Sequence, residues 1–106
     1  MAAYKRERET VKNICNSKIF ENAITSQNIL NYLFQSYLED YIPSEYDIAQ
    51  KVLGKDKNFD PLDDAAVRVH VYNLRKKLKK YYNTEGKNDP VKLEIPKGHY
   101  KIKFHE

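Results

Sequence analysis

"DDAAVRVHVYNLRKKLKKYY", residues 63–82, carries apolar residues at the spacing of an α-helix. With about 100° of rotation per residue, one stripe gathers the side chains expected in a core: Val67, Val71, Leu74, Leu78, Tyr81 and Tyr82. Val69 lies about 200° from the start of this stripe, among polar and basic residues. The pattern predicts one long helix over residues 64–82, with Val69 on its outward face.

The outward face of this helix changes character along its length. Its first half offers Arg68, Val69 and Asn73, and its second half is rich in lysines, namely Lys76, Lys79 and Lys80. A recognition helix places its amino-terminal half against base edges in the major groove, and phosphates attract lysines. Val69 would then touch a thymine methyl, and Asn73 and Arg68 would read bases. Val69 could equally be an incidental surface residue, or it could pack on the preceding helix.

Length and charge favour one domain with a surface for a polyanion. The 106 residues are 41% apolar and 32% charged, a balance typical of a folded globular domain. Residues 1–63 carry 8 Lys/Arg and 10 Asp/Glu, whereas residues 64–106 carry 11 and 5. The cationic half of the chain suggests a nucleic-acid partner. Solvated lysine-rich surfaces are also common in proteins of other functions.

The amino-terminal sequence and the single cysteine bear on location. The opening residues, "MAAYKRERETVKN", are charged and lack the apolar core of a signal peptide. No apolar run approaches the roughly 20 residues of a membrane span. Cys15 has no second cysteine with which to pair, which fits a reducing compartment. We expect a cytoplasmic protein that does not enter a membrane.

Three further helices are expected before residue 55. Residues 4–15 form the first, and Ile19 and Phe20 after it should plug into the core. The next, over residues 26–40, has a wide apolar face typical of a central helix, and Thr25 or Ser26 should cap it. Ser44 and Asp47 then form a capping-box-like pair that begins a third helix, with Gly54 as its stop.

The last part of the chain, "VKLEIPKGHYKIKF" over residues 91–104, alternates apolar and polar residues. This pattern predicts a β-hairpin with "PKGH" as its turn, and the hairpin must pack on the helices to be stable. The predicted fold is therefore mainly α with a C-terminal β-hairpin, in the order of a winged helix-turn-helix. Residues 1–25 would pack as a helix and connector on the winged-helix core formed by residues 26–106.

A family resemblance supports this fold. "AVRVHVYNLRKKL" resembles the recognition helix of the OmpR/PhoB-type winged-helix DNA-binding domains of response regulators, and Gly98 and Tyr100 resemble the wing of that family. The chain is more similar to a variant at the amino terminus of some bacterial regulators and of proteins associated with adenylate cyclase or TPR modules. The matching segments within residues 11–104 are Phe59-Asp60-Pro61, Arg68, Tyr81-Tyr82, Glu85-Gly86, Asp89-Pro90-Val91 and Ile95-Pro96-Lys97-Gly98.

The resemblance implies which residues contact DNA. Base-reading contacts would come from Arg68, Val69, Tyr72 and Asn73. Phosphate contacts would come from His70, Arg75, Lys76 or Lys77 and from the wing around Lys97. The predicted phosphate set also includes Lys79 and Lys80 of the basic half of the helix, and His99 of the wing. The wing over residues 91–104 would lie on the backbone or in the minor groove. Two departures stand out. Residues 1–25 look helical where response regulators open with a small β-sheet, and Tyr72 and Asn73 stand where those proteins often have arginines.

Neither a metal site nor an enzyme is expected. Asp56, Asn58 and Asp60 alternate as at the start of a calcium loop, but Pro61 and Val67 occupy the positions that require Gly and Glu. The three histidines are not spaced as zinc ligands, and no catalytic triad or phosphate loop is present in the sequence. We therefore expect no cofactor.

The sequence predicts sequence-specific binding of double-stranded DNA in transcriptional regulation. We expect a monomer in solution that could form a dimer on tandem DNA sites. The alternative is a protein-interaction module that keeps the winged-helix scaffold and does not bind DNA. The acidic loop over residues 56–64 would suit that alternative, because carboxylates repel phosphates.

Overall fold

In the computed structural model, which describes residues 3–106, helix α4 spans Ala66–Asn83. Its buried side chains are Val67, Val71, Leu74, Leu78 and Tyr81. Val69 is 52% exposed, so the predicted register and the outward position of this valine are confirmed. The carboxylate of Asp64 accepts a hydrogen bond from the Ala66 N–H at 2.9 Å, which places the start of the helix two residues after the position predicted.

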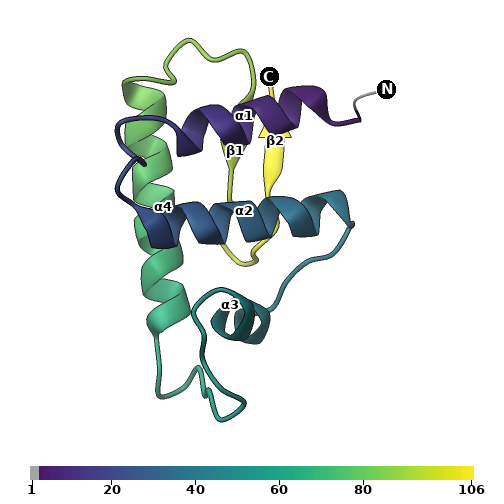
Figure 1. Cartoon of the computed structure of the whole chain (residues 1–106), viewed down its shortest axis with the longest axis vertical. Coiled ribbons are helices and arrows are strands. Elements are labelled where there is room, and N and C mark those ends of the chain that lie inside the picture. The colour runs from purple at the N-terminus through teal and green to yellow at the C-terminus, as the bar shows by residue number, and fades with distance from the viewer. Residues whose placement is uncertain (1–2) are drawn as a thin grey trace.

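Three helices precede α4: α1 (Lys5–Cys15), α2 (Ile24–Leu38) and α3 (Glu45–Lys51). In Figure 1, α1 and α2 run across the view one above the other, α4 stands upright beside them, and α3 lies below α2. Helix α4 packs against α2, α3 and the first strand. Helix α4 therefore joins α2 and α3 to the carboxyl-terminal strands.

The central position of α2 follows from its wide apolar face. Ile29, Leu30, Leu33 and Phe34 are buried, as predicted. The predicted cap is wrong, because α2 begins at Ile24 and Thr25 and Ser26 lie inside its first turn. The chain turns earlier than expected because the Gln27 side chain donates to the Phe20 carbonyl and its backbone N–H to that of Ala23.

The start of α3 confirms the predicted capping box. The Ser44 hydroxyl accepts from the Asp47 N–H at 3.1 Å, and the Asp47 carboxylate accepts from the Ser44 N–H at 2.9 Å. The same carboxylate accepts from the Tyr41 hydroxyl, and these bonds, that of Tyr41 first, hold the pKa of Asp47 below its usual value. The helix ends at Lys51, and Gly54 follows with a φ of +69° that side chains rarely adopt.

The carboxyl-terminal hairpin is shorter than the alternating pattern suggests. Strands β1 (Lys92–Glu94) and β2 (Lys103–His105) pair antiparallel with Leu93 opposite Phe104, and residues 95–102 connect them without ladder pairing. Ile95 and Ile102 are nevertheless buried. The ladder stops early because Pro96 has no N–H to donate and because carbonyls of this connection accept hydrogen bonds from α4, as described below.

Tyr81 and Tyr82, which belong to the segments that resemble the winged-helix family, hold the end of α4 to the hairpin and to the loop before it. The Tyr82 hydroxyl accepts from the Leu93 N–H at 2.8 Å, and the Tyr81 hydroxyl donates to the Asp89 carboxylate at 2.6 Å. Burial, followed by the bond to Asp89, raises the pKa of Tyr81. A Cβ on Gly86 would lie 2.2 Å from the Tyr81 ring, so only glycine fits there. These motif residues serve the fold.

The architecture is mainly helical, with a small antiparallel sheet at the carboxyl terminus. Val11 and Ile14 of α1 are buried in the same core as α2 and α4. Residues 52–65 form a long connection between α3 and α4.

Two substitutions on α4 test the register of this helix. Leu74 is fully buried, so Leu74→Ala should lower the free energy of unfolding by about 2–5 kcal/mol. Val69→Ala should change the free energy of unfolding by no more than about 0.5 kcal/mol, because about half of the valine surface is exposed to solvent. Chemical denaturation of both variants measures the difference. Equal losses would mean that Val69 belongs to the core.

Candidate nucleic-acid interface

The amino-terminal half of α4 presents an apolar and amide surface to solvent. Val69 is 52% exposed and Tyr72 is 59% exposed, and Asn73 is also exposed. Within residues 3–106, no hydrogen bond engages the Asn73 side chain. These three residues of the predicted base-reading set therefore lie together with their side-chain ends accessible.

The carboxyl-terminal half of the same face is cationic. Lys76, Lys79 and Lys80 are exposed, and Lys77 is half-buried. The ammonium of Lys76 lies 5.5 Å from the centre of the Tyr72 ring, so a cation–π contact joins the two halves of the face. The predicted gradient from apolar to basic side chains is therefore present on the surface of α4.

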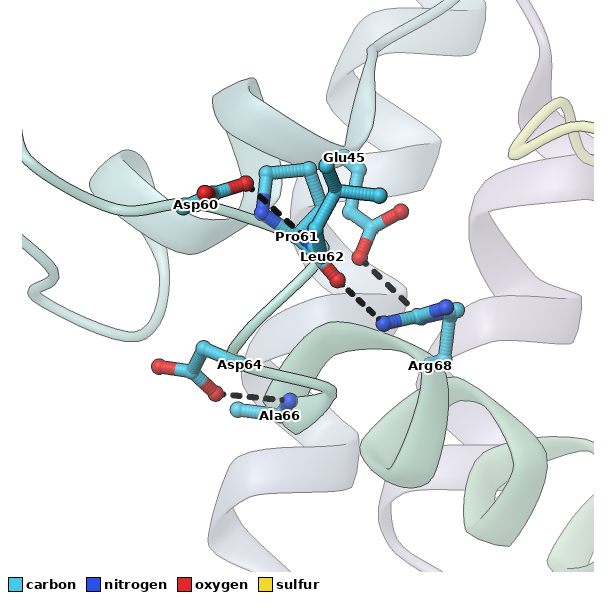
Figure 2. Close-up of polar contacts among 7 residues, drawn as sticks. All are labelled: Glu45, Asp60, Pro61, Leu62, Asp64, Ala66 and Arg68. Carbon is cyan, nitrogen blue, oxygen red and sulfur yellow. Dashed lines mark hydrogen bonds and ion pairs between the residues drawn. The ribbon is translucent and has the colours of Figure 1, made fainter.

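Arg68 is placed differently from the other predicted base-reading residues. Its Nη2 donates to the Pro61 carbonyl at 2.5 Å, and its Nε lies 3.3 Å from Oε2 of Glu45 on α3. Figure 2 shows the guanidinium turned toward Glu45 and the loop, and both contacts drawn as dashed lines. The side chain of Arg68 is 54% exposed and that of Glu45 20%. These two contacts engage part of the Arg68 guanidinium within the protein.

Glu45 depends on Arg68 for its charge balance. Its Oε2 is buried, and no hydrogen bond from the described residues reaches it. The guanidinium of Arg68 is the cation beside this oxygen, and a carboxylate left without a partner in such a place is costly. Arg68 therefore links α3, α4 and the connection between them, a role that its position on the helix did not reveal.

Most carboxylates of the connection between α3 and α4 accept hydrogen bonds from nearby backbone N–H groups or pair with a nearby lysine. Asp60 accepts from the Leu62 N–H at 3.0 Å, and Asp64 lies 2.9 Å from the ammonium of Lys55. The bond from Lys55, followed by that from the Ala66 N–H, lowers the pKa of Asp64. The bonds of Asp60 to Leu62 and of Asp64 to Ala66, drawn in Figure 2, arrange the loop at the amino end of α4. Leu62 remains 91% exposed at its surface.

Arg75 anchors the connection between the two strands. Its Nε donates to the Ile95 carbonyl at 2.9 Å and its Nη2 to the Pro96 carbonyl at 3.0 Å. The side chain is half-buried, so this predicted phosphate contact is engaged in positioning the hairpin against α4. These bonds could not be predicted from the sequence, because their acceptors are backbone carbonyls 20 and 21 residues away.

The other predicted wing residues lie on the exposed part of the same connection. Lys97 and His99 are exposed, and Gly98 between them has a φ of +100°. Nδ1 of His99 accepts from the Lys101 N–H at 3.3 Å. This connection therefore presents a cation just beyond the two carbonyls held by Arg75.

A groove runs along one flank of α4. It is lined by His70, Asn73, Lys76, Lys77 and Lys80 from α4, and by residues 18, 19 and 22–26 on the other wall. Sequence reasoning placed the five α4 residues at the interface. It missed Lys18 on the opposite wall, because a single lysine in a connector has no periodic pattern that would single it out.

Other kinds of site find little support in the described residues. Within residues 3–106, no group of three His, Cys, Asp or Glu side chains is placed to hold a metal ion. No helix among these residues is both long enough and apolar enough to cross a membrane. Burial raises the pKa of the Cys15 thiol, which makes it less reactive.

No protein-family model matches the chain, and no curated protein or solved structure is significantly similar to it.

The structural role of Arg68 can be measured. Arg68→Ala should lower the free energy of unfolding by about 1 kcal/mol, because the buried Glu45 oxygen loses its cation in a partly exposed pair. The variant that combines Arg68→Ala with Glu45→Gln should lose less free energy of unfolding than the sum of the losses of the two single variants. Denaturation of the four proteins gives the coupling energy. Strict additivity would show that the ion pair contributes nothing.

Proposed function

We propose that this protein is a sequence-specific DNA-binding domain of the winged helix-turn-helix type, acting in transcriptional regulation. In this proposal α3 and α4 form the helix-turn-helix, and α4 enters the major groove. The connection over residues 95–102 acts as the wing. The resemblance to OmpR/PhoB-type domains agrees with this arrangement.

The observation that carries the proposal is the graded outward face of α4. Its exposed first half offers side chains that suit base edges: Val69 for a thymine methyl and Asn73 for adenine. Its second half offers exposed lysines that suit phosphates. A helix that served only the core would need neither feature. The packing of α4 on α2, α3 and the hairpin holds this face rigidly, as recognition requires.

The engaged arginines refine the roles within this proposal. Arg68 and Arg75 position α3 and the wing relative to α4, so the first candidates for base reading are Val69, Tyr72 and Asn73. Phosphate contacts fall to the predicted lysines that make no ion pair or hydrogen bond within residues 3–106, namely Lys76, Lys77, Lys79 and Lys80 on α4 and Lys97 on the wing. Arg68 would join the candidates for base reading if, on DNA, it exchanged its contacts with Pro61 and Glu45 for a base edge.

The second candidate function is protein interaction without DNA binding. It is favoured by Leu62, which is 91% exposed on a loop rich in carboxylates, and by the intramolecular contacts of Arg68. A basic partner with an apolar pocket would suit that loop. The two candidates differ in their response to duplex DNA, which the next experiment measures.

Binding to a duplex should depend steeply on salt. Fluorescence anisotropy with a random-sequence duplex should give a log affinity that falls with log salt, at a slope of about −0.9 per phosphate contact. Lys76→Ala should weaken all sequences alike and reduce the slope by about 0.9. The matched control is Lys57→Ala, an exposed lysine on the loop before α4, and it should leave the slope unchanged. Affinity that is flat with salt would remove DNA as the partner.

Sequence preference should reside in Val69 and Asn73. Selection from a random DNA pool would yield the preferred site for the test. Val69→Ala should weaken that site by roughly 1 kcal/mol, and Asn73→Ala by roughly 1–3 kcal/mol, with nonspecific affinity unchanged. Asn31→Ala on the exposed side of α2 is the control for the loss of an amide. If both variants select the same sequences as the wild type with undiminished preference, α4 is not the reading helix.

A further inference from the structure

The groove on the flank of α4 is basic on both of its walls. Its volume is about 800 Å³. One wall consists of α4 side chains, including Lys76, Lys77 and Lys80, and the other includes Lys18 in the connector between α1 and α2. No carboxylate is among the side chains that line it. Four cations therefore face one open channel, and no acidic side chain among the lining residues neutralises them.

The wall formed by the connector is held in place by a residue just beyond the carboxyl end of α4. The Glu85 carboxylate accepts from the Lys18 N–H at 3.0 Å and from the Ile19 N–H at 3.1 Å. These two bonds fix the backbone of Lys18 relative to α4 while leaving its ammonium exposed. The pairing of Glu85 with backbone donors also reduces the repulsion that this carboxylate would exert on an anion nearby.

The groove is continuous with the outward face of α4. Asn73 and Lys76 belong both to that face and to the groove. A polyanion that met the face of α4 would therefore reach the groove without leaving the protein surface. Lys18, Lys76 and Lys80 are exposed, which suits a long solvated strand better than a small anion, since a small anion requires buried donors around it.

We propose that this groove seats one phosphate backbone of the duplex, with Lys18 of the connector and Lys77 and Lys80 of α4 as its contacts. The inference rests on the proposed DNA-binding function. It adds to the proposed interface a second surface, which comes from a part of the chain outside the helix-turn-helix. The strand in the groove is the one that borders the major groove on the side of α4 away from Arg75 and the wing. The connector residues thereby set how deeply α4 can enter.

Removal of one charge from the connector tests the inference. Lys18→Gln should reduce the slope of log affinity against log salt by about 0.9, equally for specific and random duplexes, since a phosphate contact carries no sequence information. Lys12→Gln is the matched control, because Lys12 is an exposed lysine on α1 outside the groove. It should retain the wild-type slope.

A charge added to the same wall provides a second, independent variant. Asn22 lines the groove and is exposed, so Asn22→Glu should weaken duplex binding several-fold at low salt without shifting the thermal midpoint. Asn31→Glu makes the same change of charge on the exposed side of α2, outside the groove, and should weaken binding much less. Comparison of the two separates a local contact from the effect of net charge.

The outcomes separate this inference from the proposed function. If Lys18→Gln and Asn22→Glu bind like their controls while Lys76→Ala still weakens binding, the connector wall of the groove does not contact DNA and the proposed function stands. If the wild type itself shows no salt-dependent binding to any duplex, the proposed function fails, and the groove inference fails with it.

Discussion

The buried stripe of α4 is the constraint on which the rest of the structure depends. Val71 and Leu74 are fully buried, and the helix that carries them packs on α2, α3 and β1 at once. Because the side chains of a helix are spaced by its geometry, fixing this inner stripe also fixes which residues face solvent. The exposure of Val69 and Tyr72 is thus a direct consequence of how the core is filled.

Much of this could be read from the sequence because helical periodicity is a strong local signal. The register of α4, the apolar face of α2 and the capping box at Ser44 were all predicted. The early end of the hairpin ladder was not, since it depends on Arg75 and on carbonyls about twenty residues away. Periodicity identifies the face on which a residue lies, but it carries no information about a long-range partner.

Because periodicity does not reveal long-range partners, it could not separate the arginines that pair within the protein from the lysines that stay exposed at the candidate interface. A long cationic side chain on a predicted outer face looks the same in sequence whether it awaits a phosphate or pairs within the protein. Arg68 and Arg75 pair within the protein, whereas Lys76, Lys79 and Lys80 remain exposed. The difference agrees with their chemistry, because the planar guanidinium suits fixed carbonyl and carboxylate acceptors, and the ammonium is more strongly hydrated.

The charges around α4 also resolve an apparent conflict in the proposed function. Its amino end, which would approach the bases, stands next to an acidic loop and to Glu45, and these should repel DNA. Asp64 is paired with Lys55, and Glu45 with Arg68, so each of these two carboxylates has a cation beside it. The repulsion that remains comes from more exposed carboxylates, which solvent screens. Within the proposed function, Arg68 would therefore support binding at the amino end even without touching a base, because its guanidinium offsets the charge of Glu45.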